Sequence, residues 1–476
     1  MWRKQFPFVF VLLVRLRFFF SPLTTDEGGY LAVSRAWFRG ADLYKTAWVD
    51  RPQGLLVVYG LLDRVGLGNT FGVRLLGTAA CFLAMWMCAH VARTLYGDSA
   101  FVPVLWSVGL ALSIPQVEGF IANAELLSCA VGAASLAYLL RGSWGHTSPI
   151  LRDLFVGGLL AGAAVTLKQS GFDAAVAGCV AVLLVALTTR WAFRSFAAAV
   201  GAVVGGVAVP VGLVIAHATL TGFHDWWYAV AGVRIEHKSA LASADWSKLR
   251  ETGRIVAPLV AGALLVVVLV LVRGLRATWR QVVVLKAWAA VALVAFLMGG
   301  LFHRHYWMIL MFPFGTAVGI ALSRVRSRTW MAVAVATASV WPGWRAAQAI
   351  SMDDVTVARV LDADSRLVKN EKVAAWLRTH NPGGEKVWAM CASSALYAQI
   401  NQDPPFRYSW FEYFRATPEA LPMLYAWLES DDAPQWIAAV QSAGRCDPSG
   451  KLGELLAQKY HLVDGVGEVQ MLRLAD

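Results

Sequence analysis

Long apolar segments recur along most of this chain, and each has about the length that a helix needs to cross a lipid bilayer. Crossing ~30 Å of hydrocarbon takes roughly 17–25 residues, because a helix rises 1.5 Å per residue. Hydrophobic residues make up 58% of the 476 positions and charged residues only 15%. A soluble protein of this size cannot bury so much apolar surface in its core. We therefore expect a protein that crosses the membrane many times.

The apolar segments predict about eleven transmembrane helices, with spans at residues 6–22, 71–92, 100–116, 121–140, 154–169, 172–189, 196–219, 255–273, 283–302, 306–323 and 330–349. Arg3 and Lys4 before a short apolar run resemble a signal peptide. However, the run continues without a small-residue cleavage site, so we interpret it as a retained first span. The pairs Gly158/Gly162 and Gly201/Gly205 have the spacing that predicts close helix packing.

Basic residues gather at every second connection between the predicted spans. They are Arg3, Lys4, Arg93, Arg141, Arg152, Arg190, Arg194, Arg273, Arg276, Arg280, Arg324, Arg326 and Arg328. Because Lys and Arg concentrate on the cytoplasmic side of membrane proteins, we place the N-terminus in the cytoplasm and the C-terminal part outside it. This distribution also accounts for the net charge of +11 without a nucleic-acid partner, and we exclude nucleic-acid binding.

The sequence divides into two domains. Residues 1–349 form the predicted transmembrane domain, with long outer loops at 23–70 and 220–254, where interfacial helices are expected. Residues 350–476 alternate helix-like segments (365–379, 417–429, 450–460) with strand-like segments (386–391, 435–440 and the C-terminal end). The predicted fold is therefore a polytopic α-helical membrane protein with a small extracytoplasmic α/β domain. In that domain Cys391 and Cys446 could form a disulfide, since it would lie outside the cytoplasm.

Two adjacent carboxylates, Asp26 and Glu27, follow the first span in the first outer loop. Carboxylates at a membrane face are costly unless they are solvated, paired or used. One of them could act as a general base that takes a proton from an acceptor hydroxyl. The alternative is a helix cap, because negative charge at a helix N-terminus is favourable by about 0.3–1 kcal/mol. The residues alone favour the cap.

Two cationic side chains, one in the first outer loop and one at an outer end of a span, are candidates for binding phosphate. Arg51, before Pro52, has the planar fork that binds phosphate in a bidentate manner. Lys168 lies at the outer end of the fifth predicted span. For each of them the alternative is a side chain that snorkels to the interface and anchors the chain there.

Two further groups complete the candidate site. His303, Arg304, His305 and Tyr306 form a short outer connection, and we favour contact with phosphate or sugar there. A His-x-His pair with no third ligand nearby in sequence gives no support for a divalent metal. Glu118 and Glu125 flank the start of the fourth span, where either could face the site or Glu125 could instead cap the helix.

Several motifs follow one another in order along the chain. In the first outer loop they are Asp26-Glu27-Gly-Gly-Tyr30, Gly40-Ala-Asp-Leu-Tyr44 and Trp48-Val-Asp-Arg51-Pro52-Gln-Gly54. Further along they are Asn123-Ala-Glu125-Leu-Leu, Gly158-Leu-Leu-Ala-Gly162, Leu167-Lys168-Gln169 and His305-Tyr306. These motifs, which cover most of residues 10–325, resemble the GT-C glycosyltransferases. More narrowly, they are similar to the branch of bacterial protein O-mannosyltransferases and lipid A aminoarabinose transferases.

The resemblance implies a substrate and roles for individual residues. The donor would be a polyprenyl-phosphate-linked sugar, and an inverting hexosyl- or pentosyltransferase would move the sugar to a glycan, lipid or protein acceptor. Asp26 would be the base with Glu27 beside it in support, and Arg51 would bind the lipid phosphate. This match reverses the preference for a cap at Asp26. No cofactor is implied besides the lipid-linked sugar, which is itself a substrate.

The main alternative is a flippase for a polyprenyl-linked sugar, or a secondary transporter. A transporter would place ionisable residues near the bilayer midplane and would show broken helices and a repeat between its halves. Here the charged candidates gather at predicted outer ends and no repeat is visible in the sequence. A scaffold protein would leave Asp26 and Arg51 without a role. The sequence therefore favours a glycosyltransferase of the plasma membrane.

Overall fold

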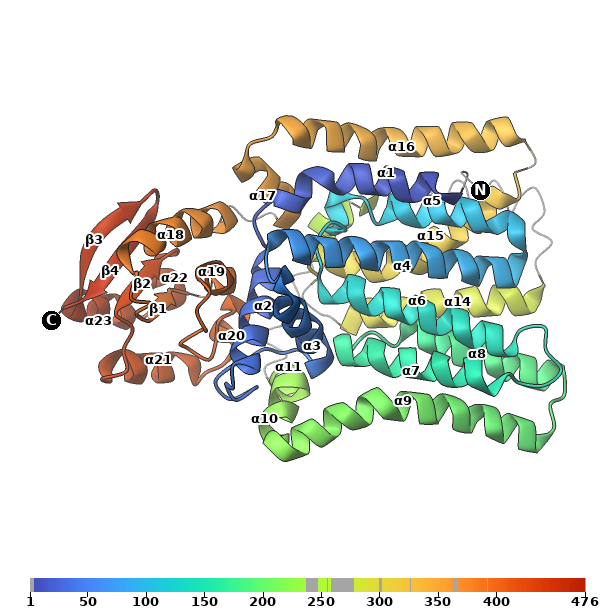
Figure 1. Cartoon of the computed structure of the whole chain (residues 1–476), viewed down its shortest axis with the longest axis horizontal. Coiled ribbons are helices and arrows are strands. Elements are labelled where there is room, and N and C mark those ends of the chain that lie inside the picture. Colours follow the sequence, from blue (N-terminus) through green and yellow to red (C-terminus); the bar gives the residue numbers. More distant parts are fainter. Residues whose placement is uncertain are drawn as a thin grey trace.

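Long helices pack into one bundle, and a smaller domain built around a four-stranded sheet lies at one end of it (Figure 1). The computed structural model describes residues 4–236, 247–254, 256–257, 278–298, 302–325, 327–362, 366–391 and 393–475. The predicted span at 255–273 lies outside the described residues, apart from 256–257.

Each of the other predicted spans coincides with a helix of the bundle. These helices are α1 (Phe6–Arg15), α4 (Thr70–Tyr96), α5 (Phe101–Ala111), α6 (Ala124–Ser143), α7 (Leu151–Leu167), α8 (Asp173–Thr188), α9 (Phe193–Thr221), α14 (Trp279–Met298), α15 (Trp307–Ser323) and α16 (Arg328–Ser351). By length and composition, five helices of the described part could each cross a membrane, and a bent pair at the N-terminus could form a sixth span. The structure therefore supports a helical membrane protein, while the count of about eleven spans remains a prediction.

Small residues set how closely two of these helices approach. A Cβ atom added to Gly158 of α7 would lie 2.1 Å from the carbonyl oxygen of Val203 in α9, so only glycine fits there. A Cβ added to Gly162 would lie 2.6 Å from Pro210 Cγ of α9, which confirms the first predicted packing pair. The structure gives no support to the second pair, because a Cβ on Gly201 would meet no atom of the described residues within 4 Å. The close contact of α9 lies instead at Gly206.

The first long loop folds between the bundle and the C-terminal domain (Figure 1). It forms α2 (Thr25–Phe38) and α3 (Gln53–Leu62), and α2 bends by 70° away from the preceding helical segment Phe6–Phe20. Most of α2 is buried rather than exposed at a membrane interface, because α19 (Ser394–Ile400) of the C-terminal domain covers it. The second long loop forms α10 (Phe223–Trp227), a π-helical turn η6 (Tyr228–Gly232) and α11 (Val233–Glu236).

The C-terminal domain has the predicted α/β pattern. Its strands are β1 (Val387–Ala389), β2 (Trp436–Ala439), β3 (Tyr460–Val466) and β4 (Val469–Leu474), in the order β1-β2-β4-β3. β1 pairs with β2 in parallel, and the other pairs are antiparallel. The helices are α17 (Asp354–Asp362), α18 (Arg366–His380), α19, α20 (Phe411–Ala416), α21 (Ala420–Glu429), α22 (Ala443–Cys446) and α23 (Lys451–Lys459). A disulfide joins Cys391 to Cys446, whose Cα atoms lie 5.6 Å apart.

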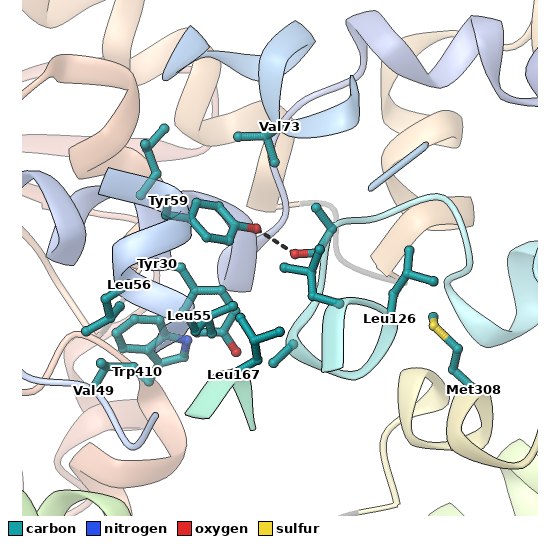
Figure 2. Close-up of a cluster of buried hydrophobic side chains, with 14 of the residues drawn as sticks. Tyr30, Val49, Leu55, Leu56, Tyr59, Val73, Leu126, Leu167, Met308 and Trp410 are labelled. Carbon is teal, nitrogen blue, oxygen red and sulfur yellow. Dashed lines mark hydrogen bonds between the residues drawn. The ribbon is translucent and has the colours of Figure 1, made fainter. Parts of the chain in front are cut away.

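One apolar core runs from the bundle through the first loop into the C-terminal domain. Figure 2 shows part of it, with Tyr30 of α2 against Trp410 of the C-terminal domain and Leu55 of α3 beside them. The hydroxyl of Tyr59 donates a hydrogen bond of 2.6 Å to the carbonyl oxygen of Ala122, which precedes α6. The first loop is therefore anchored on both sides, which gives its polar side chains a fixed support.

Candidate functional site

A polar cavity of about 620 Å³ lies where the bundle, the first loop and the C-terminal domain meet. Its wall contains carboxylates, guanidinium groups, imidazoles and aromatic rings from segments that are far apart in the sequence. Among the lining residues are Asp26, Asp50, Arg51, Glu118, Lys248, His303, Arg304, His305, Tyr306, Trp410, Glu412, Tyr413, Gln441 and Arg445. Seven of the residues predicted from the sequence are therefore brought together around one space.

Asp26 lies in the first turn of α2 and is partly exposed to the cavity. The indole N–H of Trp410 donates a hydrogen bond of 3.1 Å to its Oδ1. The hydroxyl of Ser394 donates to the carbonyl oxygen of the preceding Thr25, at 3.0 Å. The C-terminal domain thus contacts the start of α2 at two successive residues and fixes the position of the carboxylate.

Glu27 has a different environment from its neighbour, since it is fully buried and does not line the cavity. It accepts hydrogen bonds from Arg74 of α4 at 2.6 Å, from the backbone N–H of Ala122 at 2.9 Å and from that of Thr24 at 3.1 Å. With the hydroxyl of Thr24 it forms a capping box at the start of α2. Glu27 therefore caps α2, and of these two adjacent carboxylates only that of Asp26 lines the cavity.

Asp50 is the centre of a buried ionic cluster that the sequence did not reveal. Its carboxylate accepts hydrogen bonds from Arg51, from Arg234 of α11 and from the hydroxyl of Tyr413 in α20. Burial raises the pKa of Asp50, but the two guanidinium groups and the Tyr413 hydroxyl outweigh it and bring the pKa to about 2. Two guanidinium groups share one carboxylate, so the cluster carries a net positive charge beside the cavity.

The side chain of Arg51 points from this cluster toward the cavity. Its guanidinium lies 5.8 Å from the ring centroid of Tyr30, and the side chain is almost completely buried. Its Nε–H group has no hydrogen-bond partner among the described residues, and the same is true of Arg234 Nε. A buried donor without a partner favours an anionic ligand at this place.

A second polar cluster lies behind the cavity wall. Lys168 pairs with Glu125, and its ammonium nitrogen lies 4.4 Å from the ring centroid of Tyr306. Neither Lys168 nor Glu125 lines the cavity, although both were predicted at the site. His305 Nδ1 lies 2.8 Å from a carboxylate oxygen of Glu118, and both of these residues do line it. The cluster therefore supports the turn 303–306 from behind.

The turn 303–306 supplies further polar groups to the cavity. Arg304 is partly exposed, and its guanidinium group has no hydrogen-bond or ion-pair partner among the residues that the structure describes. The rings of His303 and His305 stack, with their centroids 5.4 Å apart. Within the described ranges no group of three or more His, Cys, Asp and Glu side chains could hold a metal ion.

Four important residues of the site were missed from the sequence, and one of them is Arg234, which pairs with Asp50. Asp50 stands beside Arg51 in one of the motifs of the first loop, so its position could have been noted. Trp410 lies 384 residues after Asp26, and Tyr413 lies 363 residues after Asp50. Their only local signal is two aromatic side chains at helical spacing. Their contacts with Asp26 and Asp50 depend on how the C-terminal domain docks on the first loop.

Comparison with known proteins locates the fold among solved structures. No protein-family model and no curated protein matches the chain. The structure is similar to that of ArnT from Cupriavidus metallidurans bound to undecaprenyl phosphate, with a TM-score of 0.63 and 15% identity over 98% of this chain and 96% of that chain. It is also similar to the archaeal oligosaccharyltransferase AglB from Archaeoglobus fulgidus, in complex with an inhibitory peptide and a dolichol-phosphate, with a TM-score of 0.53 and 11% identity over 98% of this chain and 73% of that chain. Both are GT-C glycosyltransferases, and the chain therefore has the GT-C fold that its sequence motifs predict.

Proposed function

We propose that this protein is an inverting glycosyltransferase that moves a sugar from a polyprenyl-phosphate donor to an acceptor hydroxyl on the outer face of the membrane. The observation that carries the proposal is the cavity itself, because Asp26 and the positively charged Arg51–Asp50–Arg234 cluster meet at it. The lipid phosphates bound to ArnT and AglB support this class of donor for a chain with the same fold.

The chemistry follows from the charges around the cavity. The acceptor oxygen attacks the anomeric carbon while the bond from that carbon to the phosphate oxygen breaks. The bonding electrons leave with the phosphate, and the acceptor proton passes to Asp26. Negative charge on the leaving phosphate grows during this step. Arg51 and Arg304 therefore stabilise the transition state more than the bound donor.

The orientation rests on the charge pattern of the sequence. The cavity is lined by residues of the first loop and the C-terminal domain together with residues of the bundle. The first loop and the C-terminal domain lie at one end of the bundle (Figure 1). The positive-inside rule assigns both of these to the outer side, with the N-terminus in the cytoplasm and about eleven spans between. In this arrangement residues 1–349 form the catalytic transmembrane domain, and residues 350–476 close the cavity from outside. A hexosyl or pentosyl group and a glycan, lipid or protein acceptor all remain compatible with the site.

Substitution of Asp26 tests the proposal. We expect Asp26→Asn to lower transfer by about 100-fold or more, since the amide cannot accept the proton. The measurement is the release of polyprenyl phosphate from a synthetic polyprenyl-phosphate sugar by purified protein, with a cell-envelope fraction as the source of acceptor. Asp403→Asn is the matched control. Asp403 of the C-terminal domain forms an ion pair with Arg39 of the first loop, and both side chains are exposed. Near-normal release by Asp26→Asn would contradict the proposal.

A further inference from the structure

One short segment of the C-terminal domain reaches both carboxylates that the first loop presents to the cavity. Trp410 immediately precedes α20, and Tyr413 lies one turn later on it. The indole N–H of Trp410 donates to Asp26, and the hydroxyl of Tyr413 donates to Asp50. The C-terminal domain is therefore part of the site wall, and its position is coupled to the orientation of the proposed base.

The indole of Trp410 is held rigidly by its surroundings. Only 5% of the residue is exposed, and its ring centroid lies 5.9 Å from that of Tyr30 (Figure 2). On the α2 side there is room for the ring only because residue 29 is glycine, where an added Cβ would lie 2.4 Å from Trp410 Cζ2. The backbone of Trp410 also forms a bridge with Ser393. The N–H group is consequently in place before any substrate enters.

A fixed N–H group such as that of the Trp410 indole can hold a general base in one orientation. A carboxylate has two equivalent oxygens and turns about its Cβ–Cγ bond, so an unrestrained Asp26 would present either oxygen in many directions. The indole nitrogen donates one hydrogen bond and accepts none, and therefore cannot take the acceptor proton itself. By holding Oδ1 it directs Oδ2 of Asp26 toward the acceptor.

We propose that Trp410 is a positioning residue for glycosyl transfer, and that the C-terminal domain completes the active site by orienting Asp26 through this indole. The inference rests on the proposed function, because it takes Asp26 as the base. It adds a role for a domain that otherwise only covers the cavity. It also means that transfer requires this domain to be docked on α2.

The test is Trp410→Phe, which keeps an aromatic ring against Tyr30 and removes the N–H donor. We expect kcat to fall about ten-fold, which corresponds to the loss of one hydrogen bond to a charged group. The KM for the donor and the affinity for polyprenyl phosphate should stay within about two-fold of the wild type. Loss of domain docking would instead change all of these quantities together.

Trp48→Phe is a matched control in the same apolar core. Trp48 is 1% exposed and packs against Tyr408 and Tyr413, but its indole N–H has no hydrogen-bond partner among the described residues. This control removes the same atoms as Trp410→Phe but no hydrogen bond. We therefore expect a loss of thermal stability similar to that of Trp410→Phe, with a near-normal kcat. If both variants have the same kcat, Trp410 does not position the base.

Two further variants keep the inference testable. If Trp410→Phe does not fold, Gly29→Ala displaces the indole without changing it, and the same loss of kcat with retained donor affinity is expected. A normal kcat in folded Gly29→Ala would overturn the inference. Asp26→Asn distinguishes a failure of the proposed function from a failure of the positioning role of Trp410. An active Asp26→Asn contradicts the proposed base, whereas an inactive one beside a fully active Trp410→Phe contradicts only the positioning role.

Discussion

Asp50→Asn is the substitution whose effect on stability the structure defines most sharply. The residue Asp50 is 3% exposed, and its carboxylate accepts hydrogen bonds from Arg51, Arg234 and Tyr413, which belong to three separate segments of the chain. Asparagine has nearly the same shape but carries no charge. Its amide nitrogen would also bring two more N–H groups into a cluster that already consists of donors.

The magnitude follows from the loss of the shared anion. Removal of one partner of a buried ion pair costs about 3–5 kcal/mol, because the remaining charge is left uncompensated. In Asp50→Asn two guanidinium groups lose their partner, although the side chain of Arg234 is 27% exposed and water offsets part of the cost there. The matched control is again Asp403→Asn, whose ion pair with Arg39 is 44% exposed on both sides and contributes ~0–1 kcal/mol.

Thermal unfolding of the purified protein in detergent, followed by tryptophan fluorescence, measures the difference. We expect Asp50→Asn to lower the unfolding midpoint by roughly 5 °C or more relative to Asp403→Asn. Limited proteolysis should release the C-terminal domain earlier, because Tyr413 loses its partner. The double variant Asp50→Asn/Arg234→Gln should be more stable than the sum of the two single effects predicts, since it removes one of the stranded charges. Equal midpoints for Asp50→Asn and Asp403→Asn would refute the reasoning.

Three other predictions concern stability. The native pKa of Asp50 is about 2, below its ordinary value of 3.8, so its stabilising effect is complete above about pH 4 and is lost as the pH falls through 2. The unfolding midpoints of the wild type and of Asp50→Asn should therefore differ by the same amount from pH 5 to 8 and converge near pH 2. Reduction of the Cys391–Cys446 disulfide, which closes 55 residues, should destabilise the C-terminal domain by about 4 kcal/mol, and an unchanged midpoint with dithiothreitol would contradict this. Glu27→Gln leaves Arg74 buried without an anion, which should lower the free energy of unfolding by about 3–5 kcal/mol and so reduce the yield of folded protein. A stable but inactive variant would instead indicate a role of Glu27 in transfer.

Much of the fold could be predicted because its signals are local. A run of apolar residues identifies a helix of the bundle, and alternating helix and strand patterns in residues 365–474 match the elements of the C-terminal domain. Asp26 and Arg51 were found for the same reason, since both belong to one continuous loop whose motifs stand in order along the chain. Both of them line the cavity.

The remaining features depend on tertiary structure. Successive residues of a helix point about 100° apart, so Asp26 faces the cavity while Glu27 turns to Arg74. The sequence alone does not show which of two adjacent acidic residues faces the cavity. The hydrogen bond from Trp410 to Asp26 joins residues 384 positions apart. Lys168 was expected at the cavity but pairs with Glu125 behind it, because the ends of two helices meet there.

The most direct test of the central claim follows a labelled polyprenyl-phosphate sugar in proteoliposomes that contain the purified protein and an envelope acceptor fraction. Two quantities are measured together, the release of free polyprenyl phosphate and the movement of the intact donor between leaflets. If the cavity carries out glycosyl transfer, free polyprenyl phosphate accumulates in step with labelled acceptor, and Asp26→Asn stops both. Movement of the intact donor without release of polyprenyl phosphate would contradict the claim and identify a flippase.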